Sequence, residues 1–145
     1  MANSGSITSG PANSYYYNRT ITLSWSVASQ SISNNTTTIN WTLQGSGGAT
    51  NNWVTSGNFN VIIDGVQRYF SATRINVWNG TVIASGSCTL GHDSAGNKSF
   101  SAYIEAGIGY VAVSQSASGS WTLPNIPRAA NITSAPDFND TQNPT

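Results

Sequence analysis

Charge is the feature that this sequence lacks most. Only 7% of its 145 residues are charged, five basic and five acidic, so the formal net charge is zero, whereas a soluble domain typically carries about 25%. Nucleic-acid binding needs several cations on one face to displace counterions, and five scattered basic residues do not supply them. A basic amphipathic helix of the kind that lies on membrane surfaces is also missing from the sequence. The composition therefore predicts neither a nucleic-acid partner nor a membrane partner.

Cysteine and long apolar runs are also scarce. The single cysteine, Cys88, excludes an intrachain disulfide, and it lies in an alternating run where we interpret it as a small buried hydrophobe. No apolar run approaches the ~20 residues of a membrane span. The first residues have neither the basic segment nor the apolar core of a secretory signal. We therefore expect synthesis in the cytosol, and release by lysis or within a particle if the protein works outside the cell.

Alternation of apolar and polar residues is the dominant pattern that is present. It is clearest in residues 19–27, where Ile21, Leu23 and Trp25 alternate with Ser and Thr. This period of two predicts a strand with one buried face, and an aromatic content of 10% argues against disorder. The same pattern predicts further strands at residues 37–43, 58–63, 66–72, 74–78, 81–90, 98–106, 110–116 and 119–123.

Turn signals separate these strands. Asp64-Gly65 and Asn79-Gly80 are typical of two-residue hairpins, because both central positions need a positive φ. Residues 92–97 predict a longer turn with Gly96 in the left-handed conformation. About eight to ten short strands at regular spacing predict an all-β antiparallel β-sandwich, either immunoglobulin-like or a jelly roll.

The domain organisation follows from where the alternation begins and ends. We expect the sandwich to occupy residues 19–123, with residues 1–18 as an N-terminal extension or edge strand. Prolines accumulate after Leu123, so residues 124–145 read as a linker or the start of a following domain. The sequence leaves open whether the native chain continues past Thr145.

Catalytic constellations are poor in this chain. Glycoside hydrolysis needs two carboxylates that flank one bond, and the sandwich contains only Asp64, Asp93 and Glu105. The two aspartates begin turns, and Glu105 alternates with inward residues, so it is expected to face solvent. The only histidine, His92, is interpreted as an ordinary surface residue of a turn. We therefore predict no catalytic residue and no enzyme activity.

Metal and cofactor sites are equally poorly supported. Only His92-Asp93 and Asp137 with Asp140 pair ligand types at short spacing. The segment 137–140 has oxygen ligands suited to Ca²⁺ but lacks enough acids. The prediction is no metal and no cofactor.

Tryptophan is the residue type that exceeds the ordinary needs of a small domain. Trp25, Trp41 and Trp121 alternate with apolar or polar neighbours along expected strands, so we interpret them as core residues.

A second group of aromatics lies near expected loops. Trp53 follows a loop rich in Gly and Asn, Trp78 precedes a turn, and Tyr16 belongs to a run of three tyrosines. Aromatic rings at loop tips stack on the apolar faces of sugars, and Asn51 and Asn52 would satisfy sugar hydroxyls. The same rings also suit contacts between protein subunits or simple strand packing. These five residues are the candidate ligand-binding set, with the three alternatives left open.

The order of several short motifs resembles a known module. The motifs are residues Thr22–Val27, Thr38–Leu43, Gly91–Ser101, Gly119–Pro124 and Ile126–Ala129. Together they resemble a module common in tail, baseplate and tail-fibre proteins of siphophages and prophages of Gram-positive bacteria, over roughly residues 20–130.

The resemblance implies a virion structural protein at the host-facing end of a phage tail, made in the cytoplasm of the bacterial host. Its expected partners are other tail proteins, copies of itself and a host cell-wall glycan. It implies no catalytic residue. The alternative is a pure spacer or oligomerisation domain with no ligand of its own.

Overall fold

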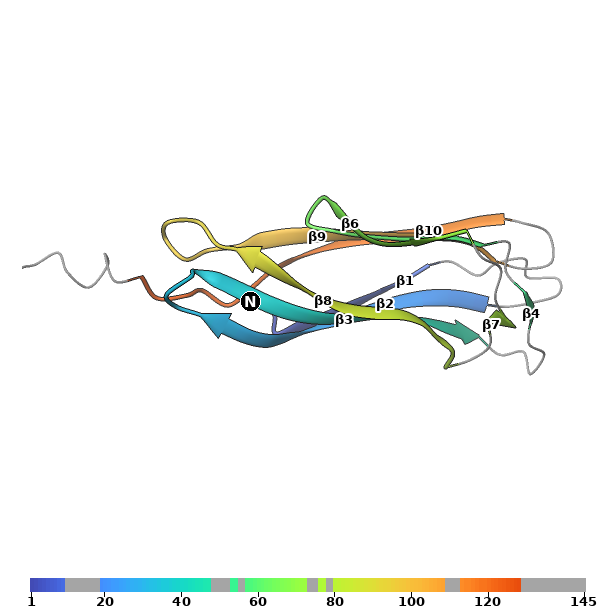
Figure 1. Ribbon diagram of the computed structural model, residues 1–145, viewed down its shortest axis with the longest axis horizontal. Coiled ribbons are helices and arrows are strands. Elements are labelled where there is room, and N and C mark those ends of the chain that lie inside the picture. The colour runs from blue at the N-terminus through green and yellow to red at the C-terminus, as the bar shows by residue number, and fades with distance from the viewer. Residues whose placement is uncertain are drawn as a thin grey trace, which may run out of the picture.

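The protein folds as a β-sandwich in which two four-stranded antiparallel sheets enclose the core (Figure 1). The computed structural model describes residues 1–9, 19–47, 53–54, 57–72, 76–77, 80–108 and 113–128. Every regular element in these ranges is a strand, and we find in them no helix long and apolar enough to cross a membrane. The predicted all-β sandwich is confirmed.

The first sheet has the strand order β1-β2-β3-β8, with bounds Ser4–Thr8, Arg19–Ser31, Thr36–Gly47 and Val82–Gly91. The second sheet has the order β10-β9-β5-β6, with bounds Val113–Thr122, Ser99–Ile108, Gly57–Ile63 and Val66–Ser71. Two short strands, β4 (Trp53–Val54) and β7 (Asn76–Val77), pair at one end of the sandwich (Figure 1).

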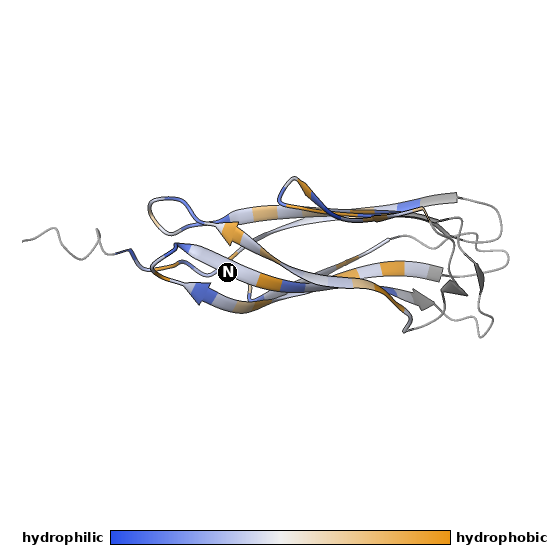
Figure 2. Ribbon diagram, viewed as in Figure 1, coloured by the Kyte–Doolittle hydropathy of each residue, from blue (hydrophilic) through white to orange (hydrophobic). Residues whose placement is uncertain are grey.

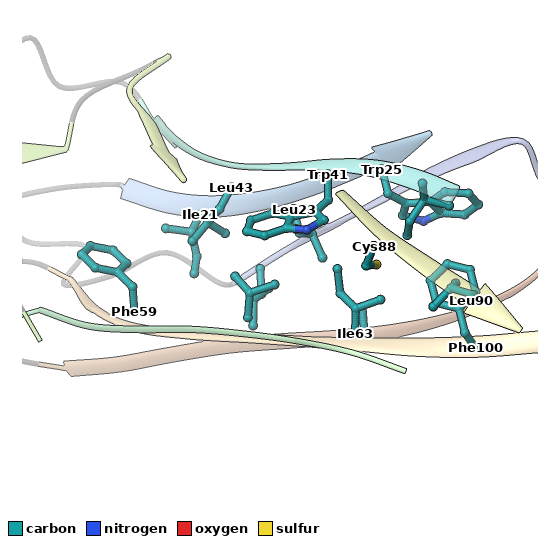
Figure 3. Packing of buried hydrophobic residues seen from close by; sticks show 14 of the residues in the cluster. Ile21, Leu23, Trp25, Trp41, Leu43, Phe59, Ile63, Cys88, Leu90 and Phe100 are labelled. Atoms are coloured by element: carbon teal, nitrogen blue, oxygen red, sulfur yellow. The ribbon is translucent and has the colours of Figure 1, made fainter. Parts of the chain in front are cut away.

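The core lies between the sheets and is built from the inward positions of the alternating strands. Hydrophobic (orange) and more polar (pale) positions alternate along β2 in Figure 2. The apolar residues face the core, and the Ser and Thr residues face outward. Figure 3 shows side chains from both sheets meeting in the middle. Each fully buried Leu, Ile or Phe stabilises the fold by about 1.5–3 kcal/mol. The largest of them are Phe59, Ile21, Leu23, Ile39, Leu43, Ile63, Leu90, Ile104, Leu123 and Ile126.

One row across the first sheet consists of two glycines and two tryptophans. The register places Gly5 opposite Trp25, Trp25 opposite Trp41, and Trp41 opposite Gly86. A Cβ atom on Gly5 would lie 2.7 Å from Nε1 of Trp25 and 2.6 Å from Nε1 of Trp121, and one on Gly86 would lie 3.0 Å from Trp41 Cζ2. The glycines are therefore needed because the indole rings occupy the space beside them.

The core interpretation of the strand tryptophans is confirmed. Trp25 and Trp41 are buried, and Trp121 is partly buried against the core. The Trp25 ring lies 5.1 Å from Phe100 and 5.3 Å from Trp121, both edge to face, an arrangement that aromatic rings favour. Nε1 of Trp25 and Nε1 of Trp41 are buried without a hydrogen-bond partner in the described part of the chain. These indoles contribute through packing.

Two turn predictions are confirmed. Asp64 and Gly65 have φ angles of 56° and 76°, and they connect Ile63 to its partner Val66 as a two-residue hairpin loop. Gly96 has a φ of 84°, as the longer turn requires.

The hairpin predicted at Asn79-Gly80 falls partly outside the described residues, because Trp78 and Asn79 are not among them. Within the described residues, β7 pairs with β4 and β8 pairs with β3, so the strands on either side of this turn have different partners. Instead, the Gly80 amide donates to the Gly45 carbonyl at 2.8 Å, and the Gly45 amide donates to the Thr81 carbonyl at 2.7 Å. Gly45 in the long β3 is therefore the backbone hydrogen-bond partner of both Gly80 and Thr81.

Strand bounds differ from the prediction at both ends of the chain: β2 runs to Ser31 and β3 to Gly47, four residues past their predicted ends. The two strands expected at 110–116 and 119–123 form one strand, β10, which continues through Gly119. Gly119 pairs with Ala102 of β9, and a Cβ there would lie 2.7 Å from Ile7 Cγ2. The ladder to β9 holds the strand together across a residue that by itself favours a break.

The packed part of the chain extends beyond the expected boundary at Leu123. At the N-terminal side, β1 pairs with β2 as an edge strand. At the C-terminal side, Ile126 is fully buried although it lies between two prolines. Residues 124–128, assigned to a linker from their prolines, therefore pack against the sandwich.

Candidate functional site

Most of the candidate ligand-binding residues lie outside the described residues. This holds for Tyr16, Asn51, Asn52 and Trp78. For Trp53 the structure describes the backbone, which begins β4 opposite Val77 of β7. β7 ends at Val77, immediately before Trp78 in the sequence. The pairing of β4 with β7 is therefore the structural information that bears on the candidate ligand-binding residues.

The two turn aspartates are occupied by structural contacts. The Asp64 carboxylate forms an ion pair with Lys98, whose Nζ lies 3.1 Å from Oδ2. The Asp93 carboxylate accepts hydrogen bonds from the amides of Ala95 at 3.0 Å and Asn97 at 2.8 Å. Asp93 thereby closes its turn in the manner typical of Asp in loops.

No cluster of ligands for a metal ion occurs in the described ranges, where no group of three or more His, Cys, Asp and Glu gathers. Asp137 and Asp140 lie outside these ranges.

His92 differs from the surface residue that the sequence predicts. It is half-buried, and both ring nitrogens are hydrogen-bonded: Nδ1 lies 2.8 Å from the Gly96 carbonyl oxygen and Nε2 lies 2.7 Å from Thr37 Oγ1. Because a carbonyl oxygen only accepts, Nδ1 of the neutral ring donates, and Nε2 accepts from the Thr37 hydroxyl. The lone pair of Nε2 is directed at the hydroxyl of Thr37, which is fully buried. The burial of Thr37, 55 positions away, could not be foreseen from the turn alone.

The hydrogen bonds continue from Thr37 to the exit of the chain. Gln30 Nε2 donates to Thr37 Oγ1 at 3.0 Å and to the Pro124 carbonyl at 3.0 Å. Thr37 is fully buried, whereas Gln30 and its bond to Pro124 are exposed, so water is excluded only at the Thr37 end. A directed chain therefore runs from Gln30 through Thr37 and His92 to Gly96.

The turn at residues 92–97 holds the exit segment through its backbone. The Ile126 amide donates to the Gly96 carbonyl at 2.9 Å, and the Leu123 amide donates to the Lys98 carbonyl at 2.9 Å. The buried Ile126 side chain anchors the segment between these bonds.

Two further side chains tie down the same segment. Asn125 Nδ2 donates to the Ala95 carbonyl at 3.1 Å and to Asn97 Oδ1 at 2.8 Å. Arg128 Nη1 donates to the Ile32 carbonyl at 2.7 Å. The exit is therefore bonded to both neighbouring turns.

Asn35 joins those two turns to each other. Its φ is 58°, a left-handed conformation that Asn tolerates. Its side-chain amide donates to the carbonyls of His92 at 3.1 Å and Asp93 at 2.8 Å, and its own carbonyl accepts from the His92 amide at 2.9 Å. We name the whole set the exit network: Gln30, Asn35, Thr37, His92, Gly96, Asn125 and Arg128.

The exit network fixes the direction in which the chain leaves the sandwich. It lies at the end opposite to β4 and β7 (Figure 1). Comparisons of the chain with protein-family models, with curated proteins and with solved structures found no match.

Proposed function

We propose that this chain is a structural module of a phage tail that takes part in virion assembly and in attachment to the host. Its partners would be other tail proteins and copies of itself, and a host cell-wall saccharide would be the ligand at attachment. In this proposal the protein is a component of the virion and not an enzyme.

The observation that carries the proposal is that the motifs of the resemblance contact one another. Residues Thr22–Val27 pair along their length with Thr38–Leu43. Trp25 in the first of these packs against Trp121 of the motif Gly119–Pro124. The motif Gly91–Ser101 holds Ile126 of the last motif by a backbone hydrogen bond. The order and spacing of five separate motifs thus have one physical explanation, the closure of one sandwich with a fixed exit.

The position of the β4–β7 pair also supports an attachment role. The pair of β4 and β7, which contains Trp53 and precedes Trp78, lies at the far end of the sandwich from the exit network (Figure 1). A module anchored through its exit would present that end outward. Trp53, Trp78 and Tyr16 would then stack on sugar rings, with Asn51 and Asn52 as polar partners.

The second candidate function is a pure spacer or oligomerisation domain. The exit network favours it, because residues 124–128 are held by five hydrogen bonds from side chains and backbone and would transmit a fixed orientation. Such rigidity is useful with or without a ligand.

The test is binding of the purified chain to intact walls of Gram-positive cells, followed by competition with free wall saccharides. We expect saturable binding that the saccharide competes. Trp53→Ala should weaken it at least tenfold (about 1.4 kcal/mol) if this ring is a binding hot spot, while Trp fluorescence and circular dichroism confirm the fold. A folded chain that binds no wall, and that sediments as a trimer or hexamer, would decide for the spacer.

A further inference from the structure

The outer faces of the two sheets are chemically different, although both belong to one sandwich. In the first sheet, two complete rows across all four strands carry only hydroxyl groups and one amide. These rows are Ser6, Ser24, Thr42 and Ser85, and Ser4, Ser26, Asn40 and Ser87. Small uncharged side chains therefore cover these two rows.

The second sheet carries large side chains at the corresponding outward positions. Its two rows are Ser118, Tyr103, Ile62 and Gln67, and Ser116, Glu105, Asn60 and Phe70. Their strand neighbours Val61, Ile63 and Ile104 are buried, so the alternation of the strands places both rows on the outer face.

The aromatic rings of this face are placed for contact. The Phe70 side chain is 55% exposed although Phe is among the residues most often buried. Tyr103 lies in β9, two strands away from Phe70 in β6, and in the neighbouring row, which is two residues along the strand. With strands ~4.8 Å apart and a rise of ~3.4 Å per residue, the two Cα atoms are separated by roughly 12 Å. Phe70 and Tyr103 therefore lie on either side of a strip that contains Asn60, Ile62 and Glu105.

The strip between the rings is polar and partly preorganised. Gln67 Nε2 donates to Asn60 Oδ1 at 2.9 Å, which fixes both amides on the surface. The amides still have donors and acceptors to offer. Glu105 lies in the same row as Asn60, and the described residues provide no ion pair for its carboxylate, since their ion pair joins Lys98 and Asp64.

We propose that this aromatic–amide face, formed by Asn60, Ile62, Gln67, Phe70, Tyr103 and Glu105, binds an uncharged, extended saccharide. Aromatic rings cover the apolar faces of sugar rings, and amides and a carboxylate pair with sugar hydroxyls, which combine donor and acceptor functions. The Glu105 carboxylate, which has no ion-pair partner among the described residues, lies in the middle of the strip and repels phosphate- or carboxylate-bearing polymers, so the chemistry selects a neutral glycan. This site is separate from the loop-end candidates, and it rests on the proposed function only for the source of the glycan.

The test is a glycan array carrying neutral and anionic oligosaccharides, followed by calorimetric titration of the full chain with the best neutral oligosaccharide. Phe70→Ala and Tyr103→Ala should each weaken binding at least tenfold, because the loss of one stacking ring removes a central contact. Gln67→Ala is a second variant at an exposed position, and it should weaken binding several-fold. Ser24→Ala, on the outer face of the first sheet, is the matched control and should bind as the wild type does.

The outcomes separate this inference from the proposed function. Binding that is lost in Trp53→Ala but unchanged in Phe70→Ala, Tyr103→Ala and Gln67→Ala would overturn the inference and leave the attachment role standing. A folded chain that binds only anionic glycans, or no glycan, would overturn it as well. A change of oligomeric mass in Phe70→Ala without any effect on glycan binding would identify the face as a protein contact, and the inference would be wrong.

Discussion

Gly96 and Ile126 are locked together at the exit of the sandwich. The Ile126 amide donates to the Gly96 carbonyl at 2.9 Å, and a Cβ atom on Gly96 would overlap the Ile126 carbonyl oxygen. Gly96 also has a φ of 84°. The turn and the exit segment therefore fit only when residue 96 has no side chain.

Replacing Gly96 by alanine should be far more damaging than the same change at Gly65. Both positions have a left-handed φ, which costs alanine about 1–2 kcal/mol. Gly65 has nothing within 4 Å of the new Cβ, so only this backbone term applies there. At Gly96 the overlap adds about 1–3 kcal/mol. Urea unfolding of Gly96→Ala and Gly65→Ala measures both, and equal losses of stability would show that the contact with Ile126 is unimportant.

Thr37 should contribute to stability through its hydroxyl group. Thr37→Val keeps the shape of the side chain but removes the partner of His92 Nε2 and Gln30 Nε2. Leaving buried polar groups unpaired costs about 1–3 kcal/mol. The control is Thr38→Val on the outer face, where the hydroxyl pairs with Thr89 at 3.0 Å near solvent, and the expected change is below about 0.5 kcal/mol. Chemical denaturation checks both, and a Thr37→Val variant as stable as Thr38→Val would disprove the role of the network.

A methyl group at Gly5 should disturb the tryptophans of the core. The new Cβ would lie within 2.8 Å of atoms of Trp25 and Trp121, and such overpacking costs about 1–3 kcal/mol. Gly91→Ala in β8 is the matched control, because nothing lies within 4 Å of its Cβ. We expect Gly5→Ala alone to change the near-ultraviolet circular dichroism of the indoles and to lower the unfolding midpoint. An unchanged spectrum would mean that the rings adapt without strain.

The Cys88 thiol should be unreactive in the folded protein. Burial raises the pKa of Cys88 above its ordinary value of 9.0, with a smaller opposing effect of Arg68. The thiolate is the reactive form, so labelling by a disulfide reagent at pH 8 should be slow in buffer and fast in denaturant. Equally fast labelling in both would contradict the buried position.

The same pKa shift predicts a loss of stability in alkali. Since the unfolded thiol ionises near pH 9.0 while the folded thiol keeps its proton, the unfolded state binds fewer protons above that pH and stability falls as pH rises. Below pH 9.0 the thiol keeps its proton in both states, and the stability that depends on this proton is fully present. Urea unfolding between pH 8 and pH 10 should show a steeper decline for the wild type than for Cys88→Ala. Parallel curves would assign the alkaline loss to other groups.

The alternation of residues predicted which side of each strand is buried, because this property depends only on the period of the backbone. Ile21, Leu23, Trp25 and Trp41 all face the core as expected. The Asp64-Gly65 hairpin was also predictable, since its φ angles are set by the two residues themselves. The candidate ligand set remains a prediction, because apart from the backbone of Trp53 it lies outside the described residues.

Strand partners and buried polar contacts were decided by the tertiary structure. The pairing of Gly80 with Gly45, the bond between His92 and Thr37, and the burial of Ile126 each join segments far apart in the sequence. The sequence by itself determined the class of fold, the faces of its strands and the turns at Asp64-Gly65 and Gly96, since these follow from neighbouring residues. Only the folded chain decided which strands pair, how the exit is held and which side chains share an outer face. Those choices depend on how the two sheets pack against each other, and no single segment of the sequence contains that information.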